Sequence, residues 1–195
     1  MISSLVQNQY AMVRIIVFLL WSLLLCETSF GKINHTFEPI DASFYTSNPN
    51  VIDSKLSVYR ISRGKYGLNG FIDIKQDLSN DYMLELYVLR SVSGNDRYIP
   101  TAIRMPPKNL EYYMNKVYKR IIMTTFSKCA PNSPQFQTEF KAPLTKRRFD
   151  LNKCLTDTTN FPYVRSGFYK VGMRFIKPYN ITWEITAKTV TTDHF

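Results

Sequence analysis

The sequence predicts a mainly β domain, built as an antiparallel β-sandwich or β-cup with one amphipathic helix. Three observations favour this fold class. Segments with alternating apolar and polar residues dominate the chain, one segment has apolar residues at helical spacing, and turn-forming residues separate these segments. The 195-residue chain is 45% hydrophobic and 14% aromatic, so an ordered core is expected rather than a disordered chain.

The first segment has the pattern of a secretory signal peptide. Arg14 supplies a positive flank, and the run 15–26 that follows it is almost wholly apolar. Ser29 and Gly31 are the small residues expected before a cut at Lys32. The apolar run is shorter than the about 20 residues that a membrane-spanning helix needs, so the leader is expected to be removed.

Two units follow from this interpretation, a signal peptide at 1–31 and a single domain at 32–195. The domain is expected to be secreted and extracellular. An uncleaved signal anchor is the alternative. Both Met1 and Met12 remain open as the start of translation.

Secretion determines how the cysteines are interpreted. With Cys26 in the leader, the mature chain keeps Cys129 and Cys154, and two cysteines in an oxidising compartment predict one disulfide. Two free buried thiols are the alternative. The sequons at Asn34 and Asn180 predict N-glycosylation at the surface of a secreted chain.

The strands are expected in segments rich in β-forming residues, and a glycine-containing break separates the first two of them. The turn "KPYN" makes the last two an antiparallel hairpin, and a proline-containing edge strand is expected before Cys154. The expected strands are Lys55–Ser62, Phe71–Leu78, Tyr82–Arg90, Arg97–Met105, Phe140–Leu151, Phe168–Ile176 and Ile181–Val190.

The segment Pro106–Phe126 is the expected helix, with Asn109 as its N-cap. Its apolar stripe is Leu110, Tyr113, Met114, Val117, Tyr118 and Ile121. Its basic outer face is Lys108, Lys116, Lys119 and Arg120. An apolar stripe in a globular domain usually faces the core, so we expect a helix packed on the sheet; a helix lying on a membrane surface is the alternative.

The chain is basic, with 25 Lys and Arg against 15 Asp and Glu and a formal net charge of +10. For a secreted protein this charge favours an anionic membrane surface, an acidic glycan or the acidic face of a receptor as partner, and nucleic acid is not expected. Solubility alone is the alternative explanation.

The residue inventory does not favour an enzyme. The mature chain has two histidines, His35 and His194, and it contains none of the common nucleophile, zinc or phosphate-loop motifs. We therefore assign no catalytic residue, metal or cofactor. Two carboxylates brought together in space, as in glycosidases, are the remaining route to hydrolysis.

The run "KC…FKAPLTK…KC…FP…GFYKV", together with the preceding "YKRIIMTTFSKC", resembles the insect chemosensory-B proteins. That family is similar to the ganglioside-activator proteins and to the wider lipid-recognition (ML) superfamily. The likeness is clearest from Tyr112 to Trp183. It implies a β-cup with a lipid-accepting cavity, secretion into the lymph around taste sensilla, and a part in gustatory detection of pheromones. Ganglioside activators have several disulfides, whereas this chain is expected to have one.

We therefore expect a carrier or co-receptor for a lipid or another hydrophobic small molecule, with a chemosensory receptor as a further partner. A secreted signalling or adhesion module with a closed core and no ligand is the alternative. The residues expected to line the cavity are the apolar ones on several strand faces and on the helix stripe. They are Leu84, Leu86, Val88, Met114, Ile121, Val171, Met173, Phe175 and Trp183.

Overall fold

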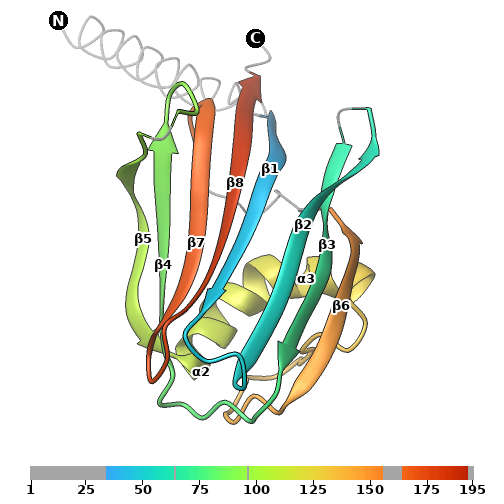
Figure 1. Cartoon of the computed structure of the whole chain (residues 1–195), viewed down its shortest axis with the longest axis vertical. Helices are drawn as coiled ribbons and strands as arrows, with labels where there is room; N and C mark the ends of the chain where they lie inside the picture. The colour runs from blue at the N-terminus through green and yellow to red at the C-terminus, as the bar shows by residue number, and fades with distance from the viewer. Residues whose placement is uncertain (1–33, 64, 96, 156–163, 193–195) are drawn as a thin grey trace, which may run out of the picture. The chain divides into compact units, whose positions relative to one another are not determined.

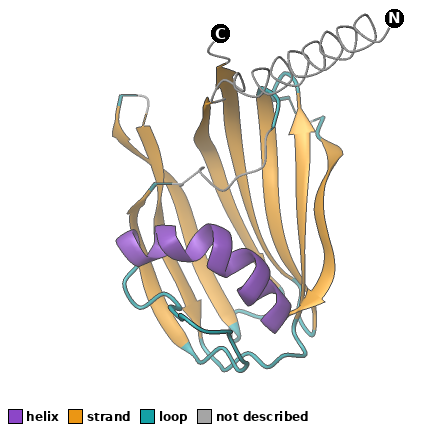
Figure 2. Ribbon diagram, turned by 180° about the vertical axis from the view of Figure 1, so that it is seen from behind, coloured by secondary structure: helices purple, strands orange, loops and turns teal. Residues whose placement is uncertain are grey.

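Two antiparallel β-sheets face each other, and one helix lies against both of them (Figure 1, Figure 2). The computed structural model describes residues 34–63, 65–95, 97–155 and 164–192. Within these, His35–Thr191 forms one compact unit. The predicted fold class, mainly β with two antiparallel sheets and one helix, is confirmed. The predicted signal peptide lies outside the described residues.

The larger sheet has five strands in the order β1-β8-β7-β4-β5, and the smaller sheet has three in the order β2-β3-β6. The strands of the larger sheet are β1 (Asn34–Thr46), β8 (Ile181–Thr192), β7 (Gly167–Lys177), β4 (Met83–Ser91) and β5 (Ile99–Asn109). Those of the smaller sheet are β2 (Ile52–Ser62), β3 (Lys65–Ile74) and β6 (Arg147–Cys154). The predicted hairpin of the last two strands is confirmed by the register that pairs Phe175 with Ile181.

The helix is continuous over 20 residues, and it joins the two sheets. It consists of α2 (Leu110–Tyr113), a π-helical stretch η1 (Met114–Ile122) and α3 (Met123–Cys129). α2 lies against β4 and β5 of the larger sheet, whereas α3 lies against β6 of the smaller one (Figure 2). The helix therefore closes one side of the space between the sheets.

The helix begins at Leu110, four residues after the start of the expected segment Pro106–Phe126 and directly after its expected N-cap. Asn109 is the N-cap, and its side chain accepts a hydrogen bond of 3.0 Å from the backbone N–H of Tyr112, as predicted. The prolines before it, Pro106 and Pro107, belong to β5 instead. β5 is an edge strand, and prolines are tolerated there because one side of the strand needs no ladder donors.

Three strands differ from the prediction. β3 begins at Lys65, inside the expected glycine break. Gly70 pairs with Leu56 inside this strand. Only glycine fits there, because a Cβ at its position would stand 1.8 Å from the Lys55 carbonyl oxygen of β2. β6 begins at Arg147, and Leu144 before it forms only an isolated bridge to Leu78. β1 was not predicted as a strand.

Candidate functional site

The inner faces of the sheets are the faces whose side chains form the shared core. On the larger sheet, cross-strand register arranges the inner residues of β4, β7 and β8 in successive rows. We call Leu84, Phe175 and Ile181 the closed row, and Val88, Val171 and Ile185 the open row. Between them lies the row of Leu86, Met173 and Trp183.

The closed row is packed core. Leu84 and Ile181 are fully buried and Phe175 is 4% exposed. The Phe175 ring meets Tyr82 edge-on with centroids 5.8 Å apart, and it lies 5.9 Å from the Trp183 ring. Such aromatic contacts add to the free energy of area burial. This end of the space between the sheets is therefore filled by side chains.

The open row differs sharply. Val171 lies on β7, a central strand with a hydrogen-bonded neighbour on each side, yet its side chain is 36% exposed. Val88 and Ile185 beside it are half-buried. An inner-face residue in a closed sandwich is covered by the facing sheet about 10 Å away. The exposure of Val171 therefore marks apolar surface between the sheets that protein atoms leave partly uncovered.

The smaller sheet presents an apolar wall on the other side. Ile52 and Ile74, a cross-strand pair, are buried, and Phe149 and Leu151 of β6 are each 4% exposed. Farther along β2, Leu56 and Val58 are only half-buried although they pack against the core. The β2 edge of this wall is thus partly open, whereas Leu68 and Cys154 in the row of Val58 stay buried.

The helix supplies a third wall, but its inward residues change along its length. Met114 is 2% exposed and Tyr118 is 6% exposed. A π-helical turn holds more residues than an α-helical turn, because its hydrogen bonds run from i to i+5. Ile122 consequently packs against the core, whereas Ile121 is half-buried and is absent from that set. The predicted stripe assumed an α-helix throughout, and it is wrong at this position.

The residues predicted to line a cavity fall into three groups. Leu84, Phe175, Met114 and Trp183 are buried in the core. Leu86 and Met173 are half-buried and pack against it. Val88 and Val171 belong to the open row, and Ile121 lies at the edge of the helix stripe. The register brings the strand residues together on one inner face, but only some of them border uncovered space.

Two polar residues that were not predicted as site residues, Arg90 and Thr189, lie on the same inner face. The period-two alternation of β4 that groups Leu84, Leu86 and Val88 also includes Arg90, and Thr189 follows Ile185 and Ala187 on β8 in the same way. Alternation could therefore have found both residues. The predicted lining was limited to the apolar residues of each strand face, so it did not include them.

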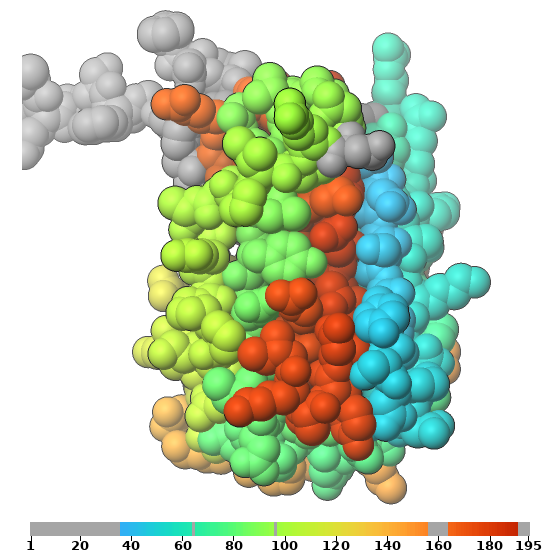
Figure 3. All heavy atoms as spheres, turned by 60° about the vertical axis from the view of Figure 1, so that its left-hand side comes forward, coloured from blue at the N-terminus to red at the C-terminus, as the bar shows by residue number. Residues whose placement is uncertain are grey.

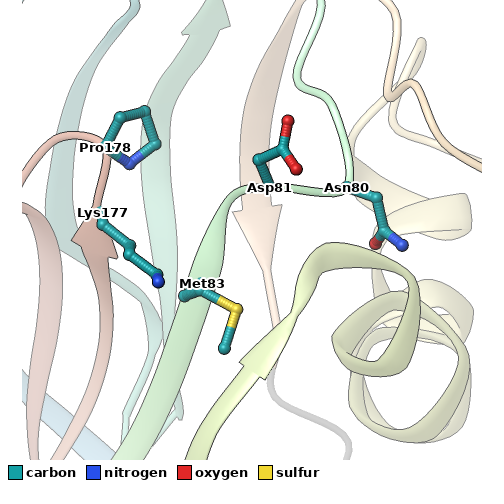
Figure 4. Close-up of a pocket in the computed structure, with 5 residues that line it drawn as sticks. All are labelled: Asn80, Asp81, Met83, Lys177 and Pro178. Carbon is teal, nitrogen blue, oxygen red and sulfur yellow. The ribbon is translucent and has the colours of Figure 1, made fainter.

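A separate pocket of about 370 Å³ opens near the start of β4 (Figure 4). It is lined by Asn80, Asp81, Met83, Lys177 and Pro178. Met83 and Lys177 are cross-strand partners where β4 begins and β7 ends, next to the closed row. The Asn80 side chain accepts a hydrogen bond of 3.0 Å from the Glu111 N–H at the helix start. This pocket holds none of the predicted ligand-binding residues.

Figure 3 shows the outer face of the larger sheet. Charged side chains on this face are paired with one another. Glu85 binds Arg174, and Glu184 lies 3.3 Å from Lys170. The Tyr87 hydroxyl donates to Glu184 over 3.1 Å. Burial first, and the neighbouring Glu184 second, raise the pKa of Tyr87 to about 12. Both carboxylates are already paired, with a cation or with a cation and a hydroxyl. Such ion pairs between neighbouring strands are usual on the solvent-facing side of a sheet.

The basic outer face predicted for the helix is present only in part. Lys108, Lys116 and Arg120 are exposed. Lys119 instead donates to the carbonyl oxygens of Gln137 and Thr138, over 2.6 and 2.7 Å. That lysine therefore holds a loop onto the helix rather than facing a partner.

The predicted disulfide is present. Cys129, the last residue of α3, is bonded to Cys154, the last residue of β6, with Cα atoms 5.2 Å apart. Among the two predicted glycosylation sites, Asn180 is exposed in the turn between β7 and β8. The side chain of Asn34 lies outside the described residues.

No helix within the described ranges has the length and apolar character needed to cross a membrane. Nor do those ranges contain a group of three or more His, Cys, Asp or Glu side chains placed to hold a metal ion.

Comparison with protein-family models and with curated proteins finds no match for this chain. The resemblance to the chemosensory-B family stays a prediction that depends on the motif residues themselves.

Proposed function

We propose that this protein is a secreted binding protein for a lipid or hydrophobic pheromone. It would hold the ligand between its two sheets and serve as a carrier or co-receptor in gustatory detection. The observation that carries the proposal is the 36% exposure of Val171 on the inner face of a central strand. A hydrocarbon chain laid along the open row removes this apolar surface from water, which favours binding by about 25 cal/mol for each Å².

The chemosensory part of the proposal depends on the resemblance of "FKAPLTK" and its flanking cysteines to the chemosensory-B proteins. Secretion is supported by the predicted leader and by the Cys129–Cys154 bridge, because such bridges persist in oxidising compartments. The net charge of +10 favours delivery to an anionic membrane surface or to an acidic receptor face.

The second candidate is a signalling or adhesion module with a closed core. The closed row favours it, because Leu84, Phe175 and Ile181 show that one end of the space is filled. A side chain in a filled core loses many contacts on truncation, whereas one that borders open space loses few. Substitutions in the open row therefore separate the two candidates.

The experiment compares two valines of nearly equal exposure. Val171 is 36% exposed on the inner face, and Val190 is 39% exposed on β8, where it alternates with the inward Thr189. V171Q and V190Q introduce the same side chain on the inner and on the outer face of the larger sheet. Affinity is measured by displacement of a fluorescent long-chain probe, and stability by thermal unfolding of the same samples.

We expect V171Q to weaken probe binding by about tenfold or more. An amide buried against hydrocarbon loses its hydrogen bonds to water, and this loss makes the free energy of binding less favourable. V190Q should bind as the wild type does. Both variants should melt within a few degrees of the wild type, since neither position is packed core. A folded wild-type protein that binds no apolar probe would refute the carrier proposal and favour the closed-core module.

A further inference from the structure

Three buried side-chain polar atoms of the described residues have no hydrogen-bond partner: Arg90 Nε, Trp183 Nε1 and Thr189 Oγ1. The strand register places all three residues on the inner face of the larger sheet. Burying a donor without a partner costs free energy, so such atoms are rare and often mark the place of a missing water or ligand. Their gathering on the face that carries the open row connects them with the proposed ligand.

Arg90 and Thr189 meet at Gly167. Thr189 is the direct cross-strand partner of Gly167 and is 2% exposed. A Cβ on Gly167 would stand 3.2 Å from Arg90 Nε and 3.6 Å from Arg90 Nη2. The guanidinium therefore lies over a position that has no side chain. Directly paired residues have Cβ positions about 5 Å apart, so the hydroxyl and the guanidinium border the same small patch.

The guanidinium is also held in orientation. Arg90 Nη2 donates to the Ser166 carbonyl oxygen over 2.9 Å, which fixes one arm of the fork and leaves Nε without an acceptor. Among the inner-face residues of the rows from Leu84–Phe175–Ile181 to Gly167–Thr189, Arg90 is the one that carries a charge. An arginine keeps that charge at any physiological pH.

The patch stands at a fixed distance from the apolar surface. Gly167 and Val171 are four residues apart on β7, and a strand rises about 3.3 Å for each residue, which separates them by about 13 Å. The row between consists of Arg90, Tyr169 and Ala187, and the last two are buried. One face thus presents a cationic, hydrogen-bonding end and then an apolar stretch, the pattern that matches an amphiphile with one head and one chain.

We propose that the natural ligand is a single-chain amphiphile whose carboxylate is bound by Arg90 and Thr189, with its hydrocarbon chain along the open row. This proposal depends on the proposed function and specifies its ligand class. A carboxylate has two oxygens, which suits one free guanidinium nitrogen and one hydroxyl, and a charge-assisted bond to Arg is the strong kind. A phosphate monoester has three free oxygens and nearly two negative charges at pH 7, more than these two unpartnered groups can satisfy.

The test compares a long-chain fatty acid, its methyl ester and the matching alcohol as competitors of the fluorescent probe. The monoalkyl phosphate with the same chain supplies the phosphate arm. In the wild type, the acid should compete about tenfold more strongly than the ester, the alcohol or the alkyl phosphate. R90Q should abolish this preference while the ester keeps its affinity. R104Q removes one charge from an exposed position on the outer side of β5, and it should change nothing.

T189V provides a second, nearly isosteric test if R90Q fails to fold, and it should lower the preference for the acid several-fold. Equal competition by acid and ester in the wild type would overturn the carboxylate proposal and leave the carrier function standing, with water at Arg90 Nε. A preference that survives both R90Q and T189V would also overturn it. Binding of no probe at all would instead refute the proposed function itself.

Discussion

The phenol ring of Tyr87 on β4 lies directly over Gly172 on β7. The two residues are cross-strand partners on the outer face of the larger sheet, and a Cβ on Gly172 would stand 2.0 Å from Tyr87 Cζ. The missing side chain allows the ring to cross the neighbouring strand and place its hydroxyl 3.1 Å from Glu184 on β8. One glycine thus connects three strands through a single tyrosine.

The first prediction concerns this pair. G172A should lower the free energy of unfolding by about 1–3 kcal/mol, because the new methyl group displaces the ring. The same substitution in a Y87A background should cost much less, giving a coupling free energy of about 0.5–3 kcal/mol in urea unfolding. Y87F serves as the control, since it keeps the ring and removes only the bond to Glu184. A G172A penalty of equal size in both backgrounds would contradict the proposed contact.

The loop between the helix and β6 gives the second prediction. Asn115 donates from Nδ2 to the Phe140 carbonyl oxygen over 3.0 Å, and it accepts from the Phe140 N–H over 2.8 Å. One side chain thus satisfies both backbone groups of a buried residue. N115A should lower the free energy of unfolding by about 2–3 kcal/mol, because both groups lose their partner.

The neighbouring K116A is the matched control for N115A. Lys116 is exposed, and a surface substitution of this kind usually changes stability by less than about 0.5 kcal/mol. Limited proteolysis should also cut N115A faster within 130–146, since the loop loses its attachment to the helix. Equal stability and equal cleavage of the two variants would show that the Asn115 bonds contribute nothing.

Sequence patterns predicted some of these elements correctly. Alternation in β4, β7 and β8 placed Leu84, Val171 and Trp183 on one face, and the register confirms that placement. The Asn109 cap was also predicted, because capping depends on a few adjacent residues. Local patterns were sufficient wherever the structure depends on near neighbours in the chain.

Patterns failed where distant residues decide the conformation. The loop at Phe140 takes its shape from Asn115, which lies 25 residues away, so no window of the loop sequence contains its cause. Gly70 was interpreted as a break, yet it pairs with Leu56 inside a strand. The Lys55 carbonyl on β2, 15 residues away, is what leaves no room for a side chain at this position. The exposure of Val171 was equally unpredictable, because it depends on the separation of two sheets rather than on any strand.

The third prediction concerns alkaline pH. Burial raises the pKa of Tyr118 to about 12, whereas an unfolded tyrosine ionises near 10. Between these values the unfolded chain loses a proton that the folded chain keeps, so stability is complete below about pH 10 and is lost as pH rises towards 12. Tyr87 shifts in the same direction. The measurement is the urea midpoint at pH 8 and at pH 11.

Y118F removes this ionisable group, so its stability should fall less between pH 8 and pH 11 than that of the wild type. At pH 8 the variant should be less stable by about 1–3 kcal/mol, because the Pro134 carbonyl loses the hydroxyl that donates to it over 2.8 Å. Y45F, at a side chain that is 57% exposed, should keep the wild-type dependence. An unchanged alkaline loss in Y118F would show that Tyr118 is not a source of it.

The fourth prediction concerns the bridge between the helix and the smaller sheet. Cys129 and Cys154 are 25 residues apart, and a crosslink over a loop of this size stabilises by about 3–4 kcal/mol in the chain-entropy model. The double variant C129A/C154A should lose about this much free energy of unfolding. K128A, which changes an exposed neighbour in the same turn, should lose little.

The loss should also be uneven along the helix. The start of the helix keeps the Asn109 cap and the bond from the Ala142 N–H to Glu111 Oε1 over 2.9 Å, and neither involves the bridge. The end of the helix keeps the ring contacts of Phe126 with Phe149 and Tyr118, with centroids 5.9 and 6.3 Å apart. Hydrogen exchange in C129A/C154A should therefore quicken at Met123–Cys129 far more than at Leu110–Tyr113. Equal acceleration at both ends would mean that the bridge stabilises only the whole domain and does not hold α3 against β6.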